Sequence, residues 1–224
     1  MTPFLNPTFI ISILIALSIH EWAHGYVAYL LGDPTAKESG RLTINPIAHL
    51  DLLGTILFLT IGFGWGKPVP IDPRYFQHPK RDTALVAIAG PVSNLILATA
   101  AYIALTIIGA RIGGDVFDLL SMGAGSSVGT LFLVNLFASS LFINLGLMAF
   151  NLIPIAPLDG SRVLHAFIPL RHEDRYEDLM RHGPMLLLIL LLAERFLNFP
   201  FLSLWISGIM NFVLSFMQRI VALF

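Results

Sequence analysis

The sequence predicts an all-α polytopic membrane protein with a three-helix core, a short re-entrant or extended segment and two C-terminal apolar helices. Apolar residues make up 56% of the 224 residues and charged residues only 12%, which is far from the balance of a soluble globular domain. Several apolar stretches reach or exceed the roughly 20 residues that cross a hydrocarbon core. The length suits a single membrane-embedded domain over residues 1–224.

Three stretches, about 8–31, 83–110 and 130–153, form the predicted core. The first ends at a Gly-Asp-Pro sequence, where Gly suits a helix C-cap and Pro cannot continue the helix. The second contains small residues that allow close helix packing in lipid. The third ends at Pro154 and Pro157, which break the helix and leave the following residues free to turn into a site.

The segment between the first two stretches is predicted to form the wall of a site. Residues 39–45 show a weak strand-like alternation, and residues 52–63 are apolar but too short to span comfortably, so they are expected to be re-entrant or interfacial. Residues 64–70 have Gly and Pro spacing that favours an extended edge or turn. Non-helical backbone at membrane depth must be buried in protein or line a wet cavity.

The C-terminal third begins with a polar stretch at 162–182, which is predicted to be a solvated loop or surface helix. We interpret its three histidines as surface residues: His165, His172 and His182. Two apolar stretches follow, about 184–197 and 200–222, and the first is short for a span.

The basic residues predict the orientation in the membrane. Of the thirteen Lys and Arg residues, six lie in 32–82 and four in 159–182. These two segments share one side if each core stretch crosses once, and the positive-inside rule places that side in the cytoplasm.

The sequence HEWAH at 20–24 is the strongest candidate for chemistry. Residues four apart lie on one helix face, so His20 and His24 are placed to share a metal ion. Glu21 points in a neighbouring direction and is placed to reach a metal-bound water without binding the metal. Zinc peptidases divide the work in this way between two imidazoles and a carboxylate.

The alternative for this motif is a solvated helix end with no metal. Residues 9–19 and 25–32 carry no charge, and ionisable groups at such a depth are costly unless they have a function. The chain contains no cysteine, so only histidine and carboxylate ligands remain. The sequence therefore favours a metal site.

A catalytic zinc site needs a third protein ligand and an open position for water. Asp159 is the best candidate because it follows the broken end of the third stretch on the predicted cytoplasmic side, and Asp51 is the competitor. His24 lies seven residues before the end of its stretch, which places the metal about 10 Å in from that surface.

Three further motifs follow HEWAH in the chain: Ala-Gly-Pro-x-x-Asn at 89–94, Asn-x-x-Pro at 151–154 and Leu-Asp-Gly at 158–160. Together the four motifs resemble those of the site-2 protease family of intramembrane zinc metalloproteases. The resemblance covers the chain to about residue 165. It implies a catalytic core at about 8–165, with C-terminal helices at about 184–222. The ordered set of motifs is more specific than any one of them.

The resemblance implies a Zn²⁺ cofactor and assigns roles to residues. His20, His24 and Asp159 would bind zinc, and Glu21 would act as general base and acid. Asn94 and Asn151 are candidates for positioning the substrate backbone or stabilising the oxyanion; for Asn94, hydrogen bonding between helices is an equal alternative. The extended residues 64–71 would be an edge to which an unwound substrate adds as a strand.

The expected partners are a transmembrane protein substrate and the lipid bilayer, in the cell membrane of a prokaryote with the site toward the cytoplasm. A net charge of -1 and the lack of a basic patch argue against a nucleic-acid partner. Compared with the family, the chain has no room for a PDZ module between the second and third stretches, and no nucleotide-sensing domain follows the last one. A metal transporter and a catalytically idle membrane adaptor remain as alternative functions.

Overall fold

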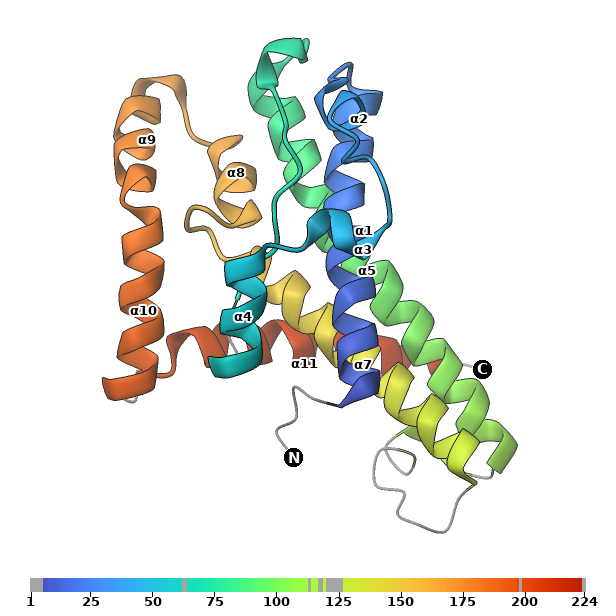
Figure 1. Ribbon diagram of the computed structural model, residues 1–224. Coiled ribbons are helices and arrows are strands. Elements are labelled where there is room, and N and C mark those ends of the chain that lie inside the picture. The colour runs from blue at the N-terminus through green and yellow to red at the C-terminus, as the bar shows by residue number, and fades with distance from the viewer. Residues whose placement is uncertain are drawn as a thin grey trace.

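The computed structural model describes residues 6–61, 64–112, 114–116, 119, 127–197 and 199–222 (Figure 1). Within these ranges the backbone forms helices and turns and no β-strand beyond one isolated bridge, so the all-α prediction is confirmed. The longer helices are α1 (Pro7–Leu30), α4 (Leu52–Ile61), α5 (Pro79–Ile112), α7 (Val128–Asn151), α9 (Glu173–Arg181), α10 (Gly183–Leu197) and α11 (Phe201–Val221). The short elements are α2 (Thr35–Glu38), α3 (Pro46–His49), η2 (Pro73–Tyr75), α8 (Asp159–His165) and η3 (Leu170–His172).

Helices α1, α5 and α7 pack together as the predicted three-helix core. Leu105 of α5 and Leu141 and Leu145 of α7 are fully buried in the apolar cluster between those two helices. Small polar side chains link α1 to α7, where Ser12 Oγ donates to the carbonyl of Leu136 at 3.2 Å. Side chains of this size allow helices to approach closely, which is the main packing device in lipid.

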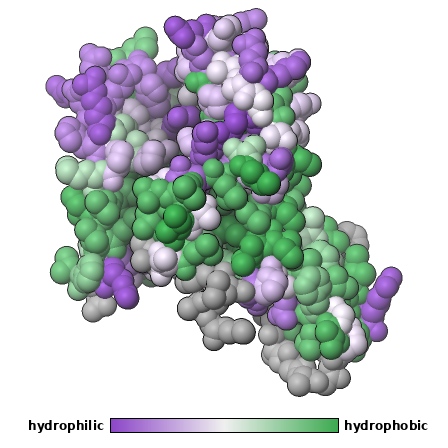
Figure 2. All heavy atoms as spheres, in the orientation of Figure 1, coloured by the Kyte–Doolittle hydropathy of each residue, from purple (hydrophilic) through white to green (hydrophobic). Residues whose placement is uncertain are grey.

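Among the described residues, four helices are long and apolar enough to cross a membrane: α1, α5, α7 and α11. Helix α10 has 15 residues, which agrees with the expectation that this stretch is short for a span. Hydrophilic residues gather at the end of the molecule that carries α2, α9 and the start of α5, and hydrophobic residues cover most of the rest of the visible face (Figure 2). The parts of the two basic segments in α2, the start of α5 and α9 therefore lie at one end, whereas α4 lies farther from it (Figure 1).

The connection from α1 to α5 differs in part from the prediction. The strand-like pattern at 39–45 forms turns and irregular backbone instead of a strand, since α2 and α3 constrain the chain on either side. The short apolar segment forms α4, which ends at Ile61; residues 62 and 63 of the predicted segment lie outside the described part. The extended backbone that follows touches the preceding chain through one antiparallel bridge, Leu50 to Gly66.

Of the three histidines predicted to lie on the surface, His165 is only partly exposed. Its side chain is 25% exposed, because its ring stacks on Tyr176 of α9 and its Nε2 lies 2.9 Å from Glu173 Oε1. His172 and His182 are exposed as predicted.

Candidate metal centre

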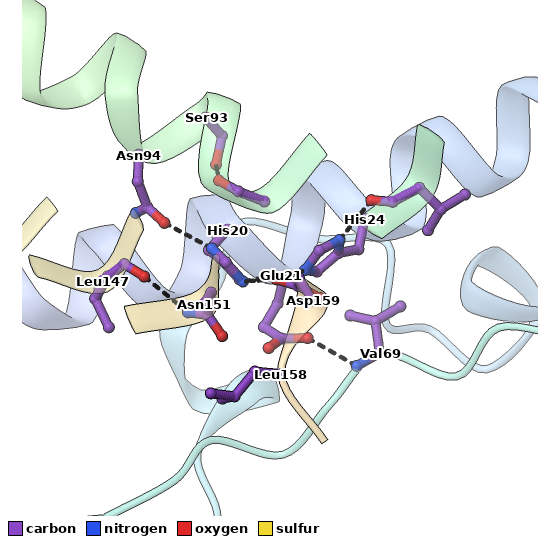
Figure 3. Close-up of polar contacts among 12 residues, drawn as sticks. His20, Glu21, His24, Val69, Ser93, Asn94, Leu147, Asn151, Leu158 and Asp159 are labelled. Carbon is purple, nitrogen blue, oxygen red and sulfur yellow. Dashed lines mark hydrogen bonds and ion pairs between the residues drawn. The ribbon is translucent and has the colours of Figure 1, made fainter. Parts of the chain in front are cut away.

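Helix α1 presents His20 and His24 from adjacent turns of one face, and both side chains are buried. Their Nε2 atoms are 3.0 Å apart. Asp159, the first residue of α8, places Oδ2 3.2 Å from each of these nitrogens (Figure 3). The structure thus brings together the three predicted metal-binding side chains. The competitor Asp51 instead accepts a hydrogen bond from the backbone N–H of Gly54 in α4.

Two close backbone approaches make room for this cluster. In α5, a Cβ on Gly90 would lie 2.5 Å from His20 Cε1 and from His24 Nε2, so only glycine lets α5 pass this close to the imidazoles. After α7, a Cβ on Gly160 would lie 2.4 Å from the carbonyl oxygen of Leu152. The glycines of the Ala-Gly-Pro and Leu-Asp-Gly motifs are therefore needed because a larger side chain would not fit at either position.

The partners of the two Nδ1 atoms define which ring nitrogens carry protons. His24 Nδ1 lies 2.7 Å from the carbonyl oxygen of Val86, which can only accept, so Nδ1 must donate. His20 Nδ1 lies 2.6 Å from Asn94 Oδ1, and the amide of Asn94 is oriented because its Nδ2 donates to Asn144 Oδ1 at 2.8 Å. Both Nε2 lone pairs are then free and directed into the cluster, the arrangement typical of histidines that bind a metal.

The atoms of the cluster fit a divalent cation. Asp159 Oδ2 is buried and has no hydrogen-bond partner among the described residues. Three lone-pair atoms thus face one another at 3.0–3.2 Å. Ligand atoms at tetrahedral zinc, about 2.0–2.2 Å from the metal, stand about 3.3–3.6 Å apart, so these three atoms need to separate only slightly to hold the ion. Two imidazoles and one carboxylate are also the ligand set of a catalytic zinc site that keeps a position open for water.

Glu21 lies half-buried beside this cluster, on the side of the extended segment. Its Oε2 accepts a hydrogen bond from the backbone N–H of Val69 at 2.9 Å (Figure 3). The predicted general base is therefore adjacent to the metal-binding side chains but held by a different part of the chain.

The two asparagines of the prediction lie in different settings. Asn94 is fully buried, and its amide is engaged by His20, Asn144 and the carbonyl of Ala16. This favours a role in linking helices and orienting His20. Asn151, at the end of α7, is half-buried and donates from Nδ2 to the carbonyl of Leu147 at 3.0 Å.

Sequence reasoning missed Asn144, which holds the amide of Asn94 and itself donates to the carbonyl of Ser140 at 2.8 Å. A signal was available, since an amide inside an apolar membrane helix is costly without a partner. Sequence reasoning also missed the contact between His24 and the carbonyl of Val86, because every residue type has a backbone carbonyl and the sequence therefore gives no signal.

A buried pair of histidines with a carboxylate, a neighbouring glutamate and helices of membrane-spanning length define a membrane metalloprotease. The family model for peptidase family M50 matches residues 8–191. Relatives named as putative zinc metalloproteases include YwhC of Bacillus subtilis (strain 168) and Rip2 of Mycobacterium tuberculosis (strain ATCC 25618 / H37Rv). YwhC is 44% identical over 165 residues, which cover 74% of this chain and 71% of YwhC. Rip2 is 29% identical over 202 residues, which cover 88% of this chain and 68% of Rip2.

No solved structure matches the chain. The chain belongs to peptidase family M50, the site-2 protease family, and is a membrane-associated zinc metalloprotease. The resemblance stated from the sequence motifs is thereby confirmed.

Proposed function

We propose that the protein hydrolyses peptide bonds within or near transmembrane segments of membrane-protein substrates. The observation that carries this proposal is the position of the cluster. His20 and His24 are buried in α1, a helix of membrane-spanning length, and Asp159 reaches them from just beyond the end of α7. We assign zinc binding to these three residues, and the general base and acid to Glu21.

The chemistry divides between the metal and the side chains. Zinc, when bound, polarises the substrate carbonyl and lowers the pKa of water toward about 7. Glu21 takes a proton from the attacking water and delivers it to the leaving amine. The carbonyl of Val86 and the amide of Asn94 hold the Nδ1 protons of the two histidines, which leaves Nε2 of each ring as the metal-binding atom and fixes the orientation of both rings.

The substrate must reach this site with an unwound backbone, because a helix uses its own carbonyls in internal hydrogen bonds. The extended residues 64–70 beside the cluster are the proposed edge for it. Pro68 and Pro70 have no N–H group, so at these positions the edge offers only carbonyl acceptors. Asn151 is better placed than Asn94 to contact the substrate, because it lies beside the cluster with its amide only partly engaged (Figure 3).

The proposed location is the cell membrane of a prokaryote with the site open toward the cytoplasm. Hydrophilic residues gather at the end of the molecule that carries α2, the start of α5 and α9 (Figure 2), which supports the positive-inside assignment. Water would reach the cluster from that end.

The test is single-turnover cleavage of a panel of transmembrane peptides in detergent, with zinc content measured on the same samples. We expect Glu21→Gln to keep its zinc and to lose about 10²- to 10⁴-fold in rate, the usual contribution of a general base. Glu38→Gln is the matched control, because Glu38 is an exposed acid on α2.

Zinc in the wild type with equal cleavage by Glu21→Gln would contradict the proposed role of Glu21. Zinc without cleavage of any peptide by the wild type would favour the transporter or the idle adaptor. Loss of zinc in Glu21→Gln would instead make Glu21 a metal ligand.

A further inference from the structure

Residues 66–70 form an extended strap that lies against α1 beside Glu21. At one end, Gly66 forms the antiparallel bridge with Leu50. The backbone N–H of Lys67 donates to the carbonyl of His49 at 2.8 Å. The strap is therefore fixed to the chain around α3 before it reaches the metal cluster.

The sequence of the strap leaves one N–H in the three residues 68–70. Pro68 and Pro70 have none, and the single remaining N–H, on Val69, donates to Glu21 Oε2 at 2.9 Å. The prolines also keep the residues before them, Lys67 and Val69, in extended conformations. The Pro-Val-Pro sequence thus directs one backbone donor at the catalytic carboxylate and cannot use the neighbouring positions as donors.

Gly25 lets the strap lie this close to α1. It stands one turn after Glu21, and a Cβ at this position would lie 3.0 Å from Val69 Cγ1 and 3.2 Å from Ala36 Cβ. These distances are tighter than ordinary van der Waals contacts. The Val69 side chain, which is buried, fills the space that the glycine leaves.

Arg41 holds the strap from a separate direction. Its Nη2 donates to the carbonyl of Lys67 at 2.7 Å and lies 3.3 Å from the carbonyl of Pro68. The strap is therefore anchored without Glu21, and the Val69 donor has a position that does not depend on the carboxylate it contacts.

We propose that the Val69 backbone N–H is a positioning group for Glu21, holding Oε2 so that Oε1 is left for proton transfer. This inference rests on the proposed proteolytic function. A carboxylate with one oxygen held by a fixed donor samples fewer orientations, and a general base loses rate steeply when it is misplaced. Arg41 and the two prolines act on the reaction only through the strap.

The experiment replaces the Val69 amide with an ester, by incorporating the α-hydroxy acid analogue of valine at this position. The side chain stays and the N–H is lost. The matched control is the same replacement at Asp72, whose N–H donates to Asp33 Oδ2 at 2.8 Å at the far end of the same connection. Both changes remove one hydrogen bond from a backbone donor to a carboxylate.

We expect the ester at Val69 to lower kcat by about 10- to 100-fold, with KM and zinc content unchanged. The ester at Asp72 should leave kcat within about twofold of the wild type, while both esters lower the unfolding temperature to a similar extent. Arg41→Ala, made by ordinary mutagenesis, should also lower kcat without loss of zinc. Its control is Arg74→Ala, which removes an exposed arginine whose one ion pair among the described residues is with Asp72.

Equal kcat for both esters would overturn the inference, because a purely structural hydrogen bond affects the two alike. A zinc deficit confined to the Val69 ester would overturn it as well. A wild type that cleaves no peptide would contradict the proposed function itself and the inference with it, and this outcome is recognised before any variant is compared.

Discussion

The amide of Asn94 links the proposed metal site to the helix core, and removing it should weaken zinc binding. Asn94 is fully buried between α1, α5 and α7. Its Oδ1 accepts from His20 Nδ1 at 2.6 Å, and its Nδ2 donates to Asn144 Oδ1 at 2.8 Å. Asn94→Ala removes the hydrogen-bond partner of two buried atoms, His20 Nδ1 and Asn144 Oδ1.

The size of the effect follows from these two contacts. A buried polar group that loses its partner costs about 1–3 kcal/mol, so two such groups should lower the free energy of unfolding by about 2–6 kcal/mol. Losing the partner that orients a metal-binding histidine typically costs about 10- to 100-fold in metal affinity. We expect the zinc Kd of Asn94→Ala to rise by this factor, because His20 is then free to rotate or change tautomer.

The assay is competition for zinc against a chromophoric chelator in detergent, with thermal unfolding recorded alongside. Ser93→Ala is the matched control, since Ser93 is also buried but donates only to the carbonyl of Gly90 in its own helix, at 2.7 Å. Its zinc Kd should stay at the wild-type value. If Asn94→Ala binds zinc as tightly as Ser93→Ala, the amide does not orient the imidazole and the reasoning is refuted.

Three other substitutions test the packing of α5, α7 and α11. Gly90→Ala places a methyl group 2.5 Å from His20 Cε1, so purified protein should contain little zinc. Gly146→Ala, where a Cβ meets nothing within 4 Å, should keep its zinc and match or exceed wild-type stability, and equal zinc in both would contradict the steric account. Trp205→Phe removes the indole donor to the carbonyl of Ala149 at 2.9 Å and should lower the free energy of unfolding by about 0.5–1.5 kcal/mol. No change in the denaturation midpoint would show that α11 does not depend on this bond.

The parts of the fold and site that could be predicted from the sequence depend on local periodicity and on motif order. Long apolar stretches are sufficient to identify α1, α5 and α7, because few other structures satisfy the backbone in lipid. Helical spacing alone places His20 and His24 on one face. Asp159 could be chosen over Asp51 because helix breakers precede it on the predicted cytoplasmic side of the membrane.

The contacts that could not be predicted join residues far apart in the chain. His24 to Val86 spans 62 positions, Glu21 to Val69 spans 48, and His20 to Asn94 spans 74. Two of these three contacts use a backbone carbonyl or N–H. Nearly every residue type has these groups, so the sequence does not reveal which of them makes a contact. The strand predicted from the alternating pattern at 39–45 does not form for a related reason. This segment contacts the strap through a side chain, that of Arg41, and not through a ladder of backbone hydrogen bonds.

The charges around the site explain why its other polar groups are neutral. Glu21 is the one carboxylate of α1, and it directly follows His20, whose Nε2 lies 3.2 Å from Asp159 Oδ2. Two neighbouring negative charges are costly at this depth unless a cation offsets them. The charge of a divalent metal would fully neutralise the two carboxylates, and neutral imidazoles add no charge. Any further charged side chain near the site would therefore leave a net charge there. Helix α7 packs beside the site without a single charged residue and contributes amides instead, because an amide such as Asn144 can orient its neighbours without adding charge.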